Sequence, residues 1–229
     1  MGLKTKIKNN KIIVSLIRFE RKIFGVNKIK GRKGNTLKIE GLMKGVKANI
    51  NGTGNQVIIK KPRINEGFNL FINGNKNVVR IEENCVLKNL SVWIEDDNNE
   101  IFIGKNTLIC GETKLSCIEG CKIRIGENCM FSSGIEFRTG DSHSILDAER
   151  KRINPSKDVN ISNHVWIGEG VTVLKGVTIE EDSIVGTKSV VTKPFTKRGV
   201  IIAGNPAKVV KEGIGWSYKR VAVGETVDD

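Results

Sequence analysis

Aromatic residues, histidines and long apolar runs are all scarce in this chain of 229 residues. With eight Phe, three Trp and one Tyr, the core is expected to consist mainly of Ile and Val. No apolar run approaches the ~18 residues that a membrane-spanning helix needs. Two histidines are too few for a three-histidine zinc site, and the five cysteines form no Cys-x-x-Cys pair. We therefore predict no metal centre.

Glycine and positive charge are in excess. The 25 glycines and the low hydrophobic fraction of 38% are typical of short strands joined by tight turns. The formal net charge is +13, and residues 1–33 carry eleven Lys and Arg against Glu20 alone. Apolar residues recur at helical spacing over 11–24, which predicts an amphipathic helix with a basic face.

This basic segment has two interpretations. It either caps the open end of a β-structure or rests on anionic lipid as a peripheral membrane contact. Nucleic acid is not an expected partner, because zinc-finger spacing, aromatic RNA-binding patterns and heptads are all missing. The N-terminal apolar stretch Ile12-Ile13-Val14 is too short for a secretion signal. An odd number of thiols suits a reducing compartment, so we expect a cytoplasmic protein, or one at the inner membrane face.

A six-residue repeat is the strongest signal in the C-terminal part of the chain. One inward aliphatic position recurs at Ile161, Ile167, Val173, Ile179, Val185 and Val191. Neither a helix nor an ordinary strand produces this period, whereas a three-sided solenoid with six residues on each side does.

An earlier stretch repeats with a step of 22 residues. Isoleucines recur at Ile59, Ile81, Ile103 and Ile125, and asparagines follow the same step in two series. Coils of about 18 residues with extra residues at one corner explain this spacing. Cys85, Thr107 and Cys129 share one position in successive coils, which predicts small core residues without a disulfide.

These periods divide the chain into three parts. Residues 1–33 form the basic segment, residues 34–200 form the solenoid, and residues 201–229 form a C-terminal tail. Within the solenoid the rhythm breaks at 139–160, a polar stretch that predicts a loop. Insertions in a solenoid loop out on one face and often carry function.

The polar break contains His143, the first of the two histidines. Its imidazole suits proton removal from an alcohol near neutral pH, and Asp141 is placed to hold the ring tautomer. An equally open interpretation is a loop histidine packed on a turn. By alternation His164 and Trp166 both point out of the solenoid. We assign His164 a surface role, and Trp166 a covered surface against a ligand or a neighbouring subunit.

Four stretches together resemble the hexapeptide-repeat acyltransferases. They are the hexad run, Asn163-His-Val-Trp-Ile-Gly, Val185-Gly-Thr-Lys-Ser-Val-Val-Thr-Lys and Ala203-Gly-Asn-Pro-Ala-Lys-Val-Val-Lys. The resemblance covers roughly residues 100–211, and the sugar O-acetyltransferases that modify capsular polysaccharide are the nearest branch. It implies an all-β, left-handed parallel β-helix that works as a homotrimer with active sites between subunits.

The resemblance also implies roles for individual residues. His143 matches the general base, Trp166 an aromatic near the thioester, and acetyl-CoA lies in a groove between coils. The residues expected to contact acetyl-CoA are Trp166, Gly168, Thr187, Lys193, Lys208 and Lys211. Those expected to contact the acceptor are Arg138 and Trp166. The acceptor-binding carboxylates and amides of the galactoside and maltose enzymes have no counterpart that we can locate.

The expected function is acetyl transfer from acetyl-CoA to a hydroxyl of a sugar or cell-surface polysaccharide. His143 would take the hydroxyl proton in a ternary complex, with a backbone N–H near Gly168 as an oxyanion donor. Alternatives are N-acetylation of a nucleotide-linked amino sugar, serine acetylation, or a β-helix scaffold without activity. The first usually needs a further nucleotide-binding domain, for which residues 1–58 are too short and irregular.

Overall fold

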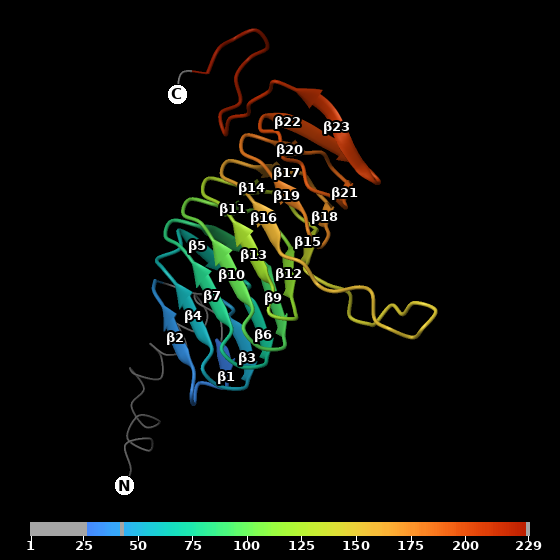
Figure 1. Cartoon of the computed structure of the whole chain (residues 1–229). Coiled ribbons are helices and arrows are strands. Elements are labelled where there is room, and N and C mark those ends of the chain that lie inside the picture. Colours follow the sequence, from blue (N-terminus) through green and yellow to red (C-terminus); the bar gives the residue numbers. More distant parts are fainter. Residues whose placement is uncertain (1–26, 42–43, 228–229) are drawn as a thin grey trace, which may run out of the picture.

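A computed structural model describes residues 27–41 and 44–227. The predicted amphipathic helix over 11–24 and its membrane contact lie outside the described residues. The chain winds into a three-sided prism whose sides are parallel sheets, and a single loop projects from it (Figure 1). This is the predicted left-handed parallel β-helix. No described helix is long and apolar enough to cross a membrane.

Face A is an eight-stranded sheet that runs the length of the prism. In spatial order its strands are β1 (Lys28–Lys30), β3 (Lys47–Asn51), β6 (Asn69–Asn73), β9 (Leu90–Glu95), β12 (Thr113–Cys117), β15 (Ile135–Arg138), β18 (Thr172–Val173) and β21 (Val190–Val191). The first strand begins inside the segment 1–33, so the solenoid starts earlier than the period predicts.

Face B is a seven-stranded sheet. Its strands are β2 (Thr36–Ile39), β4 (Gln56–Ile59), β7 (Val78–Ile81), β10 (Glu100–Ile103), β13 (Lys122–Ile125), β16 (Val159–Ile161) and β19 (Thr178–Ile179). Ile59 pairs with Ile81, and Ile103 pairs with Ile125, which confirms the 22-residue step. Ile161 then pairs with Ile179, which confirms the shorter step of the hexads.

Face C is an eight-stranded sheet that ends in a reversed strand. Its strands are β5 (Ile64–Glu66), β8 (Val86–Lys88), β11 (Leu108–Ile109), β14 (Met130–Phe131), β17 (Trp166–Ile167), β20 (Ile184–Val185), β22 (Val200–Gly204) and β23 (Ala207–Glu212). The last two pair antiparallel, whereas β22 is parallel to β20. The segment predicted as a tail therefore contributes two strands to the prism.

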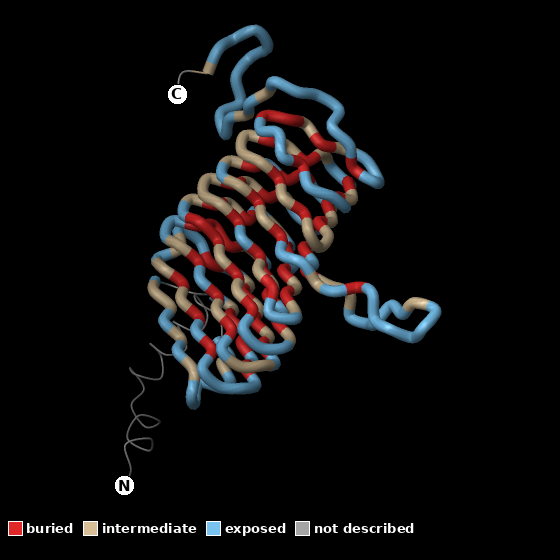
Figure 2. Tube along the Cα trace, in the orientation of Figure 1, coloured by how far each residue is buried: buried red, intermediate tan, exposed pale blue. Residues whose placement is uncertain are grey.

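The core is a set of aliphatic ladders inside the prism. Buried positions recur from coil to coil along the backbone (Figure 2). Alternation along each strand turns one residue inward and the next outward, so every coil stacks its Ile and Val on those below. Full burial of each such side chain contributes about 1.5–3 kcal/mol. Cys85, Thr107 and Cys129 are fully buried at equivalent positions, and all five cysteines are free thiols.

Asparagine ladders fix the corners. Asn55, Asn77 and Asn99 are buried. The side-chain oxygens of Asn55 and Asn77 each accept hydrogen bonds from the backbone N–H and side-chain amide of the next asparagine at 2.8–3.1 Å. At a second corner Asn84 and Asn106 have φ near +61° and form an exposed side-chain ladder. Asparagine tolerates this left-handed conformation better than other residues with a Cβ.

Candidate functional site

The loop that follows β15 carries His143. It leaves the corner between faces A and B and projects into solvent (Figure 1). The strands before and after it, β15 and β16, keep the coil register, so the extra residues between them must loop out. Asn154 is its buried anchor: its Nδ2 donates to the carbonyl of His143 at 2.9 Å and to Oδ2 of Asp141 at 2.8 Å. Its Oδ1 accepts from the backbone N–H of Ile145 at 2.8 Å.

His143 stands at the edge of a cleft of about 430 Å³. Trp93, Ser116 and Arg138 form the face A side of this cleft, and Gly140, Ser142 and His143 form the loop side. The imidazole is exposed and makes no hydrogen bond with any described residue. Its ring nitrogens are therefore free to meet a hydroxyl that enters the cleft.

Asp141 is held by other partners than the imidazole. Its Oδ2 accepts from Nζ of Lys175 at 2.5 Å and from Asn154. These hydrogen bonds hold the pKa of the Asp141 carboxyl below its usual range, so the carboxylate is charged. The expected contact with the His143 ring is not formed among the described residues. Asp141 instead supports the loop backbone that carries His143, through Asn154.

Arg138 lies beside the cleft that His143 borders. It extends from the last position of β15, and its Nη2 lies 2.7 Å from Oε1 of Glu136 on the same strand. The guanidinium is exposed, so its remaining N–H groups are available to an acidic ligand.

Trp166 lies on face C, on a different side of the prism from the His143 loop. It points outward between Met130 and Ile184, as alternation predicts, and is 37% exposed. Apolar residues occupy this outward row from one end of face C to the other: Ile64, Val86, Leu108, Met130, Trp166, Ile184 and Ile201. One chain therefore does not bring His143 and Trp166 together.

Gly168 and Thr187 meet at the corner between faces C and A. A Cβ on Gly168 would lie 2.8 Å from the backbone nitrogen of Thr187 and 3.1 Å from its Oγ1, so only glycine fits. The N–H of Gly168 donates to the carbonyl of Val185 at 2.8 Å. It is thus part of the ladder and is not free to serve as the oxyanion donor that we expected.

Two of the three lysines expected to contact acetyl-CoA share a cavity. Lys193 and Lys208 line a space of about 450 Å³ at the C-terminal end of the prism, together with Lys197. Lys211 lies on β23 opposite Ile201 and is exposed outside that cavity. No group of three metal-ligating side chains lies within 27–41 and 44–227.

An aromatic cluster beside Trp166 was not predicted from the sequence. Trp216 stacks on His164 with ring centroids 4.1 Å apart, and its Nε1 donates to the His164 carbonyl at 2.8 Å. Tyr218 packs against Trp216 and donates to the carbonyl of Asn128 at 2.5 Å. The sequence repeat does not predict this contact, because residues 213–218 follow the last strand and fold back over earlier coils.

Trp93 is another aromatic that sequence reasoning missed. It points outward from face A, 47% exposed, and stacks on Phe71 with centroids 4.2 Å apart. Its neighbours Val92 and Ile94 are buried, and Phe71 precedes it by one 22-residue step. Alternation together with the repeat would have identified this outward aromatic pair.

Comparison with known proteins agrees with this architecture. Residues 158–193 match a family model described as bacterial transferase hexapeptide (six repeats). The crystal structure of the polysialic acid O-acetyltransferase OatWY superposes with a TM-score of 0.71 and is 32% identical, over 83% of this chain and 90% of that one. The chain is a hexapeptide-repeat acyltransferase.

Sequence relatives of this acyltransferase carry a related name. A polysialic acid O-acetyltransferase from Neisseria meningitidis is 35% identical over 110 residues, which are 48% of this chain and 51% of the relative. One from Escherichia coli O1:K1 / APEC is 36% identical over 98 residues, 42% of this chain and 32% of the relative. The matches thus span about half and about a third of these curated relatives.

Proposed function

We propose that this protein transfers acetyl from acetyl-CoA to a hydroxyl of a sugar in a cell-surface polysaccharide. The observation that carries the proposal is an unpaired, exposed imidazole at the edge of a cleft, on a loop braced by buried Asn154. Membership of the acyltransferase family and the names of the relatives support the reaction class.

His143 is the general base in this proposal. Its free ring nitrogen accepts the proton of the acceptor hydroxyl while the oxygen attacks the acetyl carbonyl. The C–S bond then breaks, the acetyl group stays on the sugar oxygen, and the CoA thiolate leaves and takes a proton. Because the hydroxyl attacks the acetyl carbonyl directly, no acetyl-cysteine is formed. Burial raises the pKa of the Cys129 thiol to about 12 and that of Cys85 to about 11, which disfavours their thiolates.

We assign the acetyl-CoA site to the corner between faces C and A and to the cavity lined by Lys193 and Lys208. Gly168 lets two successive coils approach closely beside Thr187, because a Cβ there would lie 2.8 Å from the Thr187 backbone nitrogen. The pantetheine arm is proposed to lie along the outside of this corner. Lys193, Lys208 and the exposed Lys211 supply cations for phosphate groups. These donor types fit a nucleotide with several phosphates.

The complete site is proposed to form between subunits of a homotrimer. The apolar outward row on face C includes Ile64 and Trp166, each 37% exposed, and large apolar residues exposed along one face indicate a covered surface. Packing of face C against a neighbouring subunit would bury the row and carry Trp166 toward a neighbour's His143 loop. This arrangement accounts for their separation in one chain.

Thiol release from acetyl-CoA tests the proposal. The acceptors are polysialic acid, a nucleotide-linked amino sugar, and serine, each with and without enzyme, and product is checked by the mass of the acetylated acceptor. We expect release only with the polysaccharide. Preferred release with the amino sugar or with serine would replace the proposed acceptor, and release with none of them would contradict acetyl transfer.

A further inference from the structure

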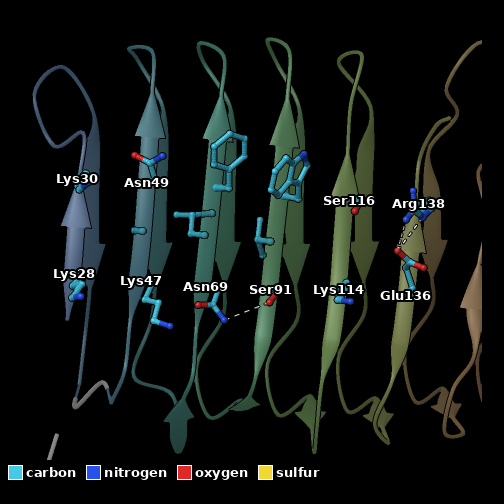
Figure 3. A pocket seen from close by; sticks show the side chains of 15 residues that line it. Lys28, Lys30, Lys47, Asn49, Asn69, Ser91, Lys114, Ser116, Glu136 and Arg138 are labelled. Atoms are coloured by element: carbon cyan, nitrogen blue, oxygen red, sulfur yellow. Dashed lines mark hydrogen bonds and ion pairs between the residues drawn. The ribbon is translucent and has the colours of Figure 1, made fainter. Parts of the chain in front are cut away.

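A groove of about 650 Å³ crosses the outward side of face A, away from the residues assigned to acetyl-CoA. Its strands are β1, β3, β6, β9, β12 and β15 (Figure 3). Each strand contributes two outward residues, so the groove is bordered by two rows of side chains, and buried residues such as Ala48, Leu70 and Val92 form its floor.

The first row is polar and carries three lysines. Strand pairing aligns it as Lys28, Lys47, Asn69, Ser91, Lys114 and Glu136 (Figure 3). Lys28 and Lys47 are exposed and form no ion pair with any described residue. Asn69 donates to Oγ of Ser91 at 3.5 Å, which leaves its side-chain oxygen free to accept from a ligand hydroxyl.

The second row places an aromatic platform between cations. It runs Lys30, Asn49, Phe71, Trp93, Ser116 and Arg138. The Phe71 and Trp93 rings stack with an interplanar angle of 28°, so each covers part of one face of the other, and the pair presents a joint apolar surface of ring edges and remaining faces. The C–H bonds on one face of a sugar ring fit such a surface, because the aromatic face carries negative charge density.

The charge of the groove has one sign. Five cationic side chains line it, Lys28, Lys30, Lys47, Lys114 and Arg138, against the single carboxylate of Glu136. Arg138 neutralises that carboxylate at 2.7 Å, and Lys114 lies 3.3 Å from Glu112 in an exposed pair. The positive excess is therefore concentrated at the β1 end, at Lys28, Lys30 and Lys47.

The groove leads to the His143 cleft. Trp93, Ser116 and Arg138 line both the groove and the cleft, so the two spaces share a wall. Six strands separated by about 4.8 Å give the groove a length of roughly 24 Å. This is far longer than one sugar, and its axis runs across the strands toward the loop.

We propose that this groove binds an extended segment of a polyanionic polysaccharide and guides one of its sugars to His143. That the polysaccharide is guided toward His143 rests on the proposed function, whereas its binding in the groove does not. The cations pair with carboxylates spaced along the polymer, and the Phe71–Trp93 platform stacks on sugar rings. Asn49, Asn69, Ser91 and Ser116 hydrogen-bond the hydroxyl groups.

Direct binding in the absence of acetyl-CoA tests the groove. The probes are unacetylated polysialic acid, a sialic acid trisaccharide, neutral dextran of the same length and a single-stranded polynucleotide. We expect tight binding of polysialic acid, weaker binding of the trisaccharide because it covers fewer contacts, and none of dextran. Affinity for polysialic acid should fall as salt rises, since exposed charges are screened.

Neutralised variants identify the surface. Lys47→Gln/Lys114→Gln should weaken polysialic acid binding about tenfold at low salt. Lys38→Gln/Lys105→Gln removes the same charge away from face A and should change it by less than about twofold. Trp93→Ala should cost about tenfold even at high salt, and Trp93→Phe should retain most of the affinity. Thermal unfolding checks that each variant is folded.

Four results would overturn the proposed groove. The first is dextran binding as tight as polysialic acid binding, and the second is a Lys47/Lys114 variant that behaves like the Lys38/Lys105 control. The third is polynucleotide binding that is as tight as polysialic acid binding and is insensitive to Trp93→Ala, and the fourth is dissociation of the oligomer by the Lys47/Lys114 variant. The last would make face A a contact between copies. Polysaccharide binding without acetyl transfer to any acceptor would refute the proposed function alone, and transfer without polymer binding would refute the groove alone.

Discussion

The ring nitrogen Nδ1 of His164 lies 2.9 Å from Oδ1 of Asp182, one coil further along the prism. Both residues have φ near +55–60° and continue the corner that Asn84, Asn106 and Asn128 form in earlier coils. His164 therefore replaces an asparagine in a structural ladder. Of the two histidines, His164 has a structural role, whereas the exposed His143 ring forms no hydrogen bond with any described residue.

Replacement of His143 by Ala should abolish most acetyl transfer without loss of folding. Removal of a general base costs at least about a hundredfold in rate, and an exposed loop residue contributes little to stability. The measurement is kcat from thiol release, with thermal unfolding alongside. Ser144→Ala, next to it on the loop and also exposed, is the matched control and should keep its rate. Near-full activity of His143→Ala would reject the assignment.

Asn77→Ala should destabilise the prism by about 2–3 kcal/mol. The Asn77 side-chain oxygen accepts from the buried backbone N–H of Asn99 at 2.8 Å, and alanine leaves that donor without a partner. Urea unfolding followed by circular dichroism gives the free energy of unfolding. Asn73→Ala, at an exposed position, should stay within about 0.5 kcal/mol of the parent. Equal stability of both variants would show that the ladder contributes nothing.

Acid should weaken the corner at Asp182. The Arg198 guanidinium, and then His164, lower the pKa of the Asp182 carboxyl. A lowered folded-state pKa adds stability that is complete above the unfolded value of about 3.9 and is lost as pH falls through the folded value. Melting temperatures below about pH 5 should therefore fall less steeply for Asp182→Asn than for the parent. Glu149→Gln, exposed on the loop, should keep the parental slope.

Thiol reagents should distinguish one cysteine from the other four. Burial raises the pKa of Cys117 and Cys129 to about 12, whereas Cys110 is exposed. Iodoacetamide at mildly alkaline pH should add a single adduct, at Cys110, as read by peptide mass spectrometry. Cys110→Ser should then resist labelling until the protein is denatured, and its acetyl transfer rate should match the parent. Rapid labelling of Cys129 in the folded protein would contradict the burial.

The repeats made the solenoid predictable to the level of strand register. Ile161 and Ile179, or Ile59 and Ile81, stack because the period itself states which residues are one coil apart. The Asp141–Lys175 hydrogen bond has no such signal, since the loop interrupts the count. Alternation places Trp93 on the outside, but the sequence does not state which outward residues gather into a groove. That depends on the sizes of side chains on six neighbouring strands.

The reversed strand β23 ends face C at the C-terminal end of the prism. Every other strand pair in the three sheets is parallel, and any parallel strand added to β22 would extend the stack by another coil. β23 occupies that edge in the opposite direction and carries the charged residues Lys208, Lys211 and Glu212 along it. Unpaired sheet edges template aggregation, and charged or covered edges prevent it. A chain ended before Ala207 would thus be prone to fibre growth by end-to-end stacking.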